Sequence, residues 1–434
     1  MWNSFIETVT KVNDWVNGAV WGWPMIIMIL GTGILLTVRT GVLQVRKFGA
    51  SVNSTIVPAV KDMRKSKKGR DKNAVSQFEA FSAAISGTVG TGNIIGVTSA
   101  ILTGGPGAVL WMWISAFFGM VTNYSENVLG LYYRKKEKDG SFSGGAFYYI
   151  AYGIKQRWLG MLAAIFCLLA AVGMSGVQTN KITGSYTSVL NNDSAEVKLI
   201  IGGIVALLAA VVIIGGIKRI GRIASMLVPF MSLLFIAMAF IIIGKNYTAI
   251  PETFRLIFTS AFSAKAVAGG VGGFAFSQII KKGLARGVFS NEAGLGSSVI
   301  AHSASETREP VKQGLWGIFE VFFDTFVICT LTALVVLTTN IGSGAYENGT
   351  FFGTTDAAGN FIGASDSATA LGAFSSNLGM FGTVTFLIIL PLFAFTTVLA
   401  WSYYGEKAVD FCFRHMSESK RKIPVLIFKI IYIL

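Results

Sequence analysis

The chain has 434 residues, of which 53% are hydrophobic and 13% carry a formal charge. Soluble domains carry about twice that share of charge, so the composition excludes an ordinary soluble protein. Several apolar runs approach or exceed the roughly 20 residues needed to cross a bilayer. The sequence therefore predicts an all-α polytopic membrane protein.

Nine apolar segments follow one another along the chain and are predicted to span the membrane. They lie at residues 19–38, 76–102, 107–133, 158–180, 197–217, 223–244, 260–281, 314–339 and 372–404. A further apolar stretch begins at Ile423 and holds only about 12 residues, too few to span a bilayer. Because the sequence stops within this stretch, we expect the C-terminus to be truncated inside a helix.

Basic residues are concentrated in every second connection between these spans. Basic segments follow the first, third, fifth, seventh and ninth spans, and the one after the seventh contains Lys281, Lys282 and Arg286. Cytoplasmic loops of membrane proteins carry an excess of such residues, so we expect the N-terminus outside and the basic loops in the cytoplasm. This topology accounts for the net charge of +14, and a nucleic-acid partner is not expected.

The second span, here called span A, is interrupted at residues 86–93, which read Ser-Gly-Thr-Val-Gly-Thr-Gly-Asn. Each glycine costs a helix about 1 kcal/mol relative to alanine. Backbone groups freed by an interruption are tolerated at membrane depth only where they are buried in protein or line a cavity. We therefore predict that span A is a broken helix whose free N–H and C=O groups bind a ligand.

A second glycine-rich interruption is predicted at residues 268–278 of the seventh span, here called span B. Four complete spans separate the two interruptions, so A and B begin two five-span halves of opposite topology. Paired interruptions of this kind indicate the central site of a transporter, where helix N-termini attract a carboxylate and free carbonyls coordinate Na⁺. The alternative is that the glycines only allow close packing of helices.

Other polar residues within the spans are further candidates for a binding site. Thr396 and Thr397 could complete a Na⁺ site, although such hydroxyls often bond to their own helix, and Trp401 follows one turn later. Gln178 offers a donor and an acceptor to an amino acid, or forms an interhelical hydrogen bond instead. Asp324 is an acid near the middle of its span. Intramembrane carboxylates are usually functional, and ion coupling and structural pairing both remain open for it.

Two further acidic residues are predicted nearer to the cytoplasm, and one histidine is predicted beside a loop. Glu126 is expected to act in gating or in a structural network, and Glu292 is expected at the cytoplasmic mouth. His302 lies beside a polar loop, where a surface or capping role is expected. An enzyme is not expected, because the sequence has only two histidines and no metalloprotease, hydrolase or nucleotide-binding motif.

Several long runs resemble the signature motifs of the sodium:alanine (alanine or glycine:cation) symporters. They span most of the chain in the family's order and lie at residues 89–94, 104–119, 177–180, 287–297 and 401–407. The family is similar to the leucine-transporter-type fold of two inverted five-helix repeats, here preceded by one extra helix. The resemblance implies one transporter domain, 1–434. Its parts would be a first helix and basic loop at 1–73, a first repeat at 74–250 and an incomplete second repeat at 251–434.

The same resemblance implies roles for individual residues. The backbone of Thr91 and Gly92 would meet the substrate carboxylate, and Trp401 would restrict the pocket to small side chains. The other positions implied to line the pocket are Gly173, Gln178, Gly272, Gly273 and Phe276. Two Na⁺ sites are implied, one formed by Thr88 and Asn93 and the other by Ser86, Val89, Thr396 and Thr397. Asp324 and Glu126 would serve ion coupling or gating.

Together, these features predict a Na⁺-coupled symporter that acts as a monomer in the cell membrane by alternating access. Its substrate would be a small neutral amino acid, alanine or glycine, with D-alanine and glutamine as alternatives. Its expected partners are the amino acid, Na⁺ and membrane lipid. The nearest alternative is H⁺ coupling through Asp324 or Glu126. A channel or a non-transporting amino-acid sensor is the alternative from a different class.

Overall fold

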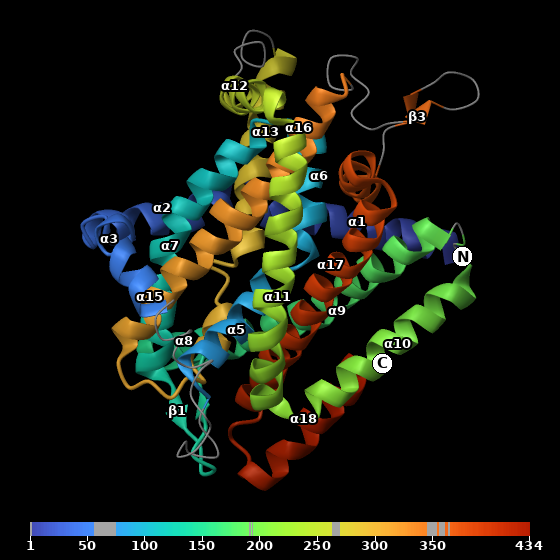
Figure 1. The fold of residues 1–434 in the computed structure, drawn as a ribbon. Helices are drawn as coiled ribbons and strands as arrows, with labels where there is room; N and C mark the ends of the chain where they lie inside the picture. The colour runs from blue at the N-terminus through green and yellow to red at the C-terminus, as the bar shows by residue number, and fades with distance from the viewer. Residues whose placement is uncertain are drawn as a thin grey trace.

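The computed structural model describes residues 2–55, 75–190, 192, 194–262, 270–344, 354–355, 361–362 and 365–434. Long helices form one bundle, with two short β-hairpins at its ends (Figure 1). The helices are α1 (Trp2–Val20), α2 (Trp23–Arg39), α3 (Leu43–Arg46), α5 (Gln77–Thr88), α6 (Val97–Gly104), α7 (Ala108–Tyr133), α8 (Ala146–Gly153), α9 (Arg157–Leu190), α10 (Ala195–Ile213), α11 (Gly216–Lys245), α12 (Ile250–Ala261), α13 (Gly270–Asn291), α14 (Ser298–His302), α15 (Pro310–Val321), α16 (Thr330–Gly342), α17 (Asp366–Cys412) and α18 (Glu418–Ile433). The hairpins pair β1 (Lys135–Lys136) with β2 (Phe142–Ser143), and β3 (Thr354–Thr355) with β4 (Phe361–Ile362).

Within the described residues, six helical segments are long and apolar enough to cross a membrane, and the bent pair of α5 and α6 makes a seventh. Large aliphatic side chains on these helices are exposed, for example Leu199 and Leu207 of α10 and Leu233 of α11. Contiguous apolar surface of this kind is suited to lipid, which offers no hydrogen bonds to backbone groups. The chain is a multi-pass membrane protein.

Span A is broken where the sequence predicts. A capping box between Ser76 and Glu79 opens α5, and the residue after its last turn, Val89, is extended (φ −83°, ψ 91°). The chain resumes as the π-helical turn η1 (Gly92–Gly96) and continues into α6, and the two halves are bent by 46°. Such π-helical turns occur frequently at functional sites, because they displace backbone groups from the regular hydrogen-bond pattern.

The predicted break of span B is wrong in position. Residues 270–278 belong to the continuous helix α13, while residues 268 and 269 lie outside the described residues. The break follows the end of α13, at three residues with positive φ: Glu292 (55°), Gly294 (91°) and Gly296 (72°). A right-handed helix cannot pass through left-handed residues. Each glycine, by contrast, lowers helix stability by only about 1 kcal/mol, which packing of α13 against α6 and α7 can offset.

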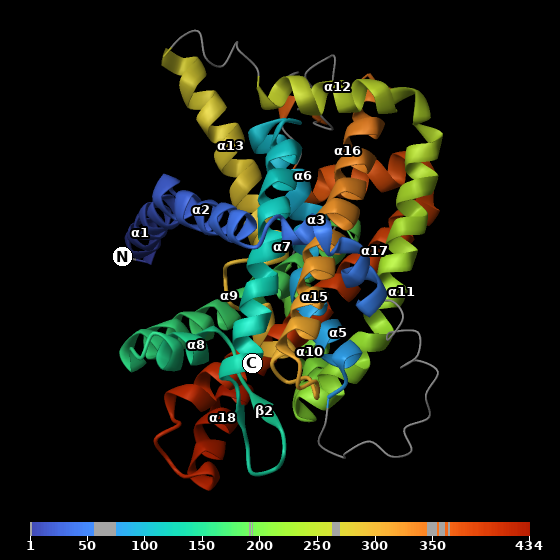
Figure 2. The same cartoon turned by 90° about the vertical axis from the view of Figure 1, so that its left-hand side faces the viewer.

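The second half of span A, α6, and the first half of span B, α13, run antiparallel and lie side by side (Figure 2). Gly96 at the start of α6 lies against Arg286, whereas Gly104 at its end lies against Lys282. Residue numbers therefore rise along α6 as they fall along α13. The two halves approach closely because glycine leaves room for the side chains of the neighbouring helix.

The other halves, α5 and α14, are arranged in the same way. Phe81 of α5 contacts the ring of His302 in α14. Val75, just before α5, forms a bridge with Ser305, just after α14. The two spans are thus paired on both sides of their interruptions, and the interruptions lie at the same level of the bundle.

Lys281, Lys282 and Arg286 lie within α13, not in the cytoplasmic loop predicted from their charge. The ammonium of Lys281 lies 5.8 Å from the ring centroid of Trp23, and the guanidinium of Arg286 lies 5.1 Å from that of Phe289. Aromatic faces attract cations, and the long aliphatic stems pack like apolar side chains. A basic cluster can therefore lie inside a helix that charge counting assigns to a loop.

The remaining helices complete the second half of the chain. α15 continues through the π-helical segment η4 (Phe322–Cys329) into α16. α17 consists of two helical segments joined by a kink at the non-helical residue Gly379 (φ 57°), and it contains an internal proline, Pro391. Proline lacks an N–H, and the Leu387 carbonyl it would have bonded accepts the Tyr186 hydroxyl instead (3.1 Å). α17 packs most extensively against α9, and this pair flanks break A.

Candidate transport site

Asn93, in the π-helical turn of span A, connects both broken spans with η4. Its amide nitrogen donates to Asp324 Oδ1 (2.5 Å) and Ser290 Oγ (3.0 Å), and its oxygen accepts the Gly90 N–H (2.9 Å). Asp324 Oδ2 accepts the hydroxyls of Ser290 (2.9 Å) and Thr325 (2.8 Å). Asn93 and Asp324 are both completely buried. A carboxylate, an amide and hydroxyls gathered at one point are ligands that suit a hard cation.

Break A also faces α9 and α17. The Thr91 hydroxyl donates to Gln178 Oε1 (2.8 Å), and the Thr91 N–H points to the same oxygen (3.4 Å). A Cβ atom at Gly90 would lie 2.5 Å from Thr397 Oγ1. The structure thus brings together Thr91, Gln178 and Thr397, which are far apart in the sequence.

Break B contacts α17 through Glu292. The Glu292 side chain accepts the Trp401 indole N–H at Oε1 (3.2 Å) and the Ser297 hydroxyl at Oε2 (2.5 Å). Glu292 is 2% exposed, so its expected position at the cytoplasmic mouth is wrong. The physical reason is the displaced break: the chain turns inward after Asn291 and carries Glu292 into the core.

The side-chain hydroxyls at the predicted Na⁺ positions are buried and bonded to carbonyls of their own helices, while at Ser86 and Val89 the predicted ligand is the backbone carbonyl. Ser86 donates to Ala83 (2.8 Å), Thr88 to Ile85 (3.2 Å), Thr396 to Leu392 and Phe393 (both 3.0 Å), and Thr397 to Phe393 (3.0 Å). A hydroxyl that donates in this way keeps lone pairs for a cation. The backbone of Val89 is extended and its side chain is buried.

The remaining predicted site residues have no described contact with break A. Gly173 is exposed on α9, and nothing lies within 4 Å of the position of a Cβ atom there. Gly272, Gly273 and Phe276 are helical in α13, and their side chains lie outside the part of the chain that the structure describes. Glu126 is buried and accepts the Gly294 N–H (3.1 Å), so it holds break B in place.

Arg286 lies directly beside break A. Its guanidinium occupies the space that side chains at Gly92 and Gly96 would otherwise fill. Its Nε and Nη2 atoms are buried and have no hydrogen-bond partner among the described residues. The sequence gives no direct signal for this contact, because it depends on α13 extending past residue 281.

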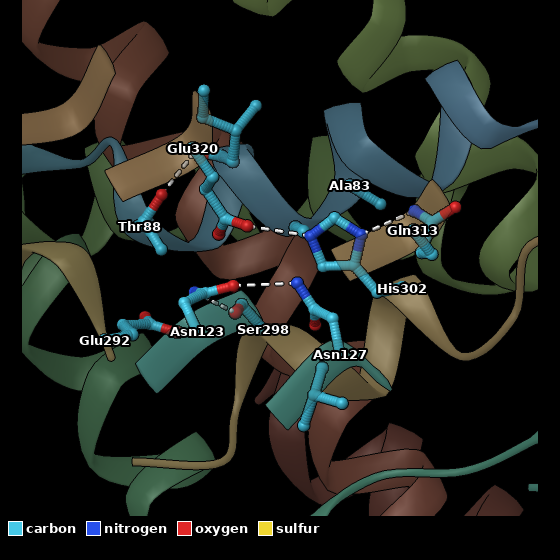
Figure 3. A network of polar contacts seen from close by, with 12 residues as sticks. Ala83, Thr88, Asn123, Asn127, Glu292, Ser298, His302, Gln313 and Glu320 are labelled. Carbon is cyan, nitrogen blue, oxygen red and sulfur yellow. Dashed lines mark hydrogen bonds and ion pairs between the residues drawn. The ribbon is translucent and has the colours of Figure 1, made fainter. Parts of the chain in front are cut away.

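The sequence interpretation misses a buried pair formed by His302 and Glu320. His302 Nε2 lies 2.7 Å from Glu320 Oε2, and its Nδ1 lies 2.6 Å from the Gln313 amide nitrogen (Figure 3). Both members of the pair are fully buried, so His302 is not a surface residue. One available signal is the spacing of Glu320 and Asp324, because residues four apart share a helix face.

The end of the bundle that carries β1 and β2 holds a separate group of charges. Arg414 pairs with Glu137 (2.8 Å), and Arg421 pairs with Asp410 (2.7 Å) and Glu137 (3.4 Å). Burial works to raise the pKa of Glu137, but the hydrogen bond and charge of Arg414 prevail and lower it below its ordinary value. This group attaches the hairpin and α18 to α17.

Two antiparallel broken helices, with polar breaks facing each other at one level of a multi-span bundle, are typical of secondary transporters. The chain matches the model of the sodium:alanine symporter family over residues 6–434. It belongs to that family, and it is a transporter and not an enzyme.

Individual relatives agree with this assignment. The chain is 38% identical to the sodium/alanine symporter AgcS of Methanococcus maripaludis, over 96% of this chain and 85% of the relative. It is 35% identical to the probable sodium/glutamine symporter GlnT of Bacillus subtilis (94% and 78%). It is 37% identical to the putative sodium/proton-dependent alanine carrier YrbD of that organism (92% and 78%).

A solved structure supports the fold. The crystal structure of MhsT in complex with L-phenylalanine matches with a TM-score of 0.54 and 15% identity, over 84% of this chain and 80% of that one. The predicted leucine-transporter-type architecture is confirmed by this likeness.

Proposed function

We propose that the chain is a Na⁺-coupled symporter for a small neutral amino acid, alanine or glycine, acting by alternating access in the cell membrane. The observation that carries the proposal is the buried group of Asn93, Asp324 and Ser290, which links both breaks at one point. A cation bound there would act on both broken spans at once. Its binding would therefore change the position of the halves that must move during transport.

The substrate would lie at break A. The N–H groups of Thr91 and Gly92 begin the second half of span A, and a helix N-terminus attracts a carboxylate. Gln178 would contribute its amide, since it already bonds to Thr91. Trp401 would limit the size of the substrate side chain, held by its bond to Glu292.

Two positions would hold Na⁺. One is formed by Thr88 and Asn93 with Asp324, and the other by the carbonyls of Ser86 and Val89 with the hydroxyls of Thr396 and Thr397. Na⁺ entering down a membrane potential supplies about 2.3 kcal/mol per charge per 100 mV, which is sufficient to drive accumulation of the amino acid.

The arrangement of the transporter follows from the antiparallel pairing of A and B. We propose that residues 74–250 and 251–434 are the two inverted repeats, that residues 1–73 precede them, and that the unit is a monomer. The N-terminus would lie outside and β1 and β2 in the cytoplasm, as the basic residues of that hairpin favour. Glu126 would gate the pathway through its bond to Gly294.

The proposal is tested by the affinity of the purified protein for alanine in Na⁺ and in choline. If the binding of Na⁺ and alanine is coupled as described, alanine binds more tightly in Na⁺ than in choline. By linkage, Na⁺ then binds more tightly in the presence of alanine, by the same factor. Equal affinities in both salts would refute Na⁺ coupling. Saturable, stereoselective counterflow separates a symporter from a channel, and binding without counterflow indicates a sensor.

A further inference from the structure

A cavity of about 440 Å³ lies beside break A, between α1, α6 and α13. Small-molecule sites in proteins typically have volumes of about 300–1,000 Å³, so this cavity is large enough for an amino acid. It extends along α6 from Gly96 to Thr103, and Arg286 of α13 forms part of its wall near Gly96. Figure 1 shows α6 and α13 on the side of the bundle away from β1, which is the side proposed above to face outward.

The charged side chains that line this cavity are mainly cationic. Among the described residues, Lys281, Lys282 and Arg286 contribute three positive charges, and Asp14 of α1 contributes one negative charge. A cleft lined by an excess of one sign of charge concentrates ions of the opposite sign. The walls of the cavity therefore favour an anionic ligand.

Arg286 is the cation of this group that lies against break A. Its Nε and Nη2 atoms are buried and have no hydrogen-bond partner among the described residues. Burial of an unpaired charge is costly. The ring of Phe289, 5.1 Å from the guanidinium, attracts the cation but offers no acceptor in the plane of these N–H groups. The guanidinium thus has donors in place and lacks an anion to accept from them.

The nearby carboxylates of the chain are already engaged elsewhere. Those that act electrostatically on Arg286 are Asp324 and Asp366. Asp324 belongs to the buried group around Asn93, and Asp366 pairs with Lys181 of α9 (3.4 Å). Neither carboxylate accepts a bond from the buried edge of Arg286. A bound ligand can supply the acceptor that these side chains do not.

The two unpaired nitrogens indicate the shape of that ligand. Nε and Nη2 lie on one edge of the guanidinium and direct two parallel N–H bonds, which match the two oxygens of a carboxylate. Nη2 is also the nitrogen nearest to Gly92, 2.5 Å from the position of a Cβ atom there. The second half of span A begins at Gly92, and a helix N-terminus attracts a carboxylate. Two independent features thus favour a carboxylate at the same place.

We propose that the Nε–Nη2 edge of Arg286 binds the carboxylate of the transported amino acid at the inner end of this cavity. Lys281 and Lys282 attract the carboxylate into the cavity, and Arg286 makes a free carboxylate a requirement for tight binding. The assignment to the substrate rests on the amino-acid site proposed above at break A. The lack of an acceptor at Arg286 does not depend on that proposal.

The experiment compares two ligands of the purified full chain, alanine and alaninamide, in which a neutral amide replaces the carboxylate. Isothermal titration in NaCl measures both affinities for the wild type, Arg286→Gln, Arg286→Lys and Arg222→Gln. Arg222→Gln is the matched control, because Arg222 is an exposed arginine of α11. Thermal unfolding checks that each variant is folded.

Arg286→Gln should lower the affinity for alanine by about tenfold to a hundredfold, as expected for the loss of charged hydrogen bonds. The affinity for alaninamide should stay at the wild-type value, because its amide does not use the charge. Arg286→Lys keeps the charge but not the paired donors, so its alanine affinity should fall between those of the wild type and Arg286→Gln. Arg222→Gln should bind both ligands like the wild type.

Unchanged alanine affinity in Arg286→Gln would overturn the proposal. Equal losses for alanine and alaninamide would also overturn it, by showing that Arg286 only supports the structure. Replacement of chloride by isethionate tests the other source of an anion. If the wild type needs chloride for tight alanine binding and Arg286→Gln removes this need, the site holds an inorganic anion and the carboxylate assignment is wrong.

The Na⁺ coupling proposed above is tested separately by repeating the wild-type titration with alanine in choline chloride. Equal alanine affinities in Na⁺ and choline would refute that coupling. A loss specific to alanine in Arg286→Gln would still support the carboxylate site.

Discussion

At the residue scale, the glycines of break A let side chains of α13 and α17 approach the backbone closely, in addition to interrupting the helix. A Cβ atom at Gly87 would lie 2.7 Å from the Tyr404 hydroxyl, and one at Gly90 would lie 2.5 Å from Thr397 Oγ1. At Gly96, the guanidinium of Arg286 occupies the same space. The interruption is therefore also a packing surface, as the alternative interpretation of its glycines predicts.

Gly107→Ala should destabilise the core, because the added methyl group would overlap the backbone of Ala261, which cannot turn aside as a long side chain can. Overpacking of this kind typically costs about 1–3 kcal/mol. Thermal unfolding in detergent measures the effect. Gly202→Ala is the control, since nothing lies within 4 Å of a Cβ atom at Gly202; equal stability of the two variants would contradict the packing described here.

Trp401→Ala should broaden the substrate range towards larger neutral amino acids, because it removes the side chain proposed to limit the pocket. Trp401→Phe keeps most of the ring and should retain the preference for alanine, while losing the bond to Glu292. Competition of unlabelled leucine against labelled alanine measures this range. If Trp401→Ala keeps the wild-type preference, size is selected elsewhere.

At the element scale, the two breaks have different origins. Break A could be predicted because three glycines and several polar residues interrupt an apolar run. Break B could not be located in this way: the glycine-rich start of α13 is helical, and the break comes at Glu292, Gly294 and Gly296. Composition shows where a helix is weak, but tertiary contacts such as that of Glu292 with Trp401 decide where it ends.

Asp324→Ala should disconnect the two breaks, because Asn93 and Ser290 would lose the acceptor that they share. Each buried donor left unpaired costs about 1–3 kcal/mol of folding stability, and loss of the carboxylate ligand should lower Na⁺ affinity by about tenfold or more. Isothermal titration with Na⁺ provides the measurement. Asp324→Asn, which keeps one acceptor oxygen, should lose less affinity; an unchanged affinity in Asp324→Ala would exclude a role in cation binding.

Glu137→Gln should weaken the attachment of the β1–β2 hairpin and α18, since Arg414 and Arg421 would lose a shared carboxylate. The lowered pKa of Glu137 means that its stabilising effect is present above about pH 4.5. The effect is lost as the pH falls through the lowered pKa. The melting temperature of the variant should therefore lie below that of the wild type at pH 7, and the difference should close as the pH falls below the lowered pKa of Glu137. Glu7→Gln, on the exposed face of α1, serves as control; a difference independent of pH would contradict the role of the charge.

At the scale of the whole molecule, the sequence predicts the class of fold and most of the central residues. Asn93, Thr91, Gln178, Thr397 and Trp401 all lie at the breaks. The sequence does not predict features that depend on contacts between distant segments. These are the contact of the Arg286 guanidinium with Gly96, the turn that buries Glu292, and the pairing of His302 with Glu320. Charge counting assigns the basic cluster of α13 to a loop, whereas these residues are helical and two of them contact aromatic rings.

The most direct test of Na⁺-coupled symport is uptake of labelled alanine into proteoliposomes under an imposed Na⁺ gradient, with a choline gradient of equal size beside it. We expect alanine to accumulate above its external concentration in Na⁺ and only to equilibrate in choline. Equal uptake under both gradients would contradict Na⁺-coupled transport by this chain.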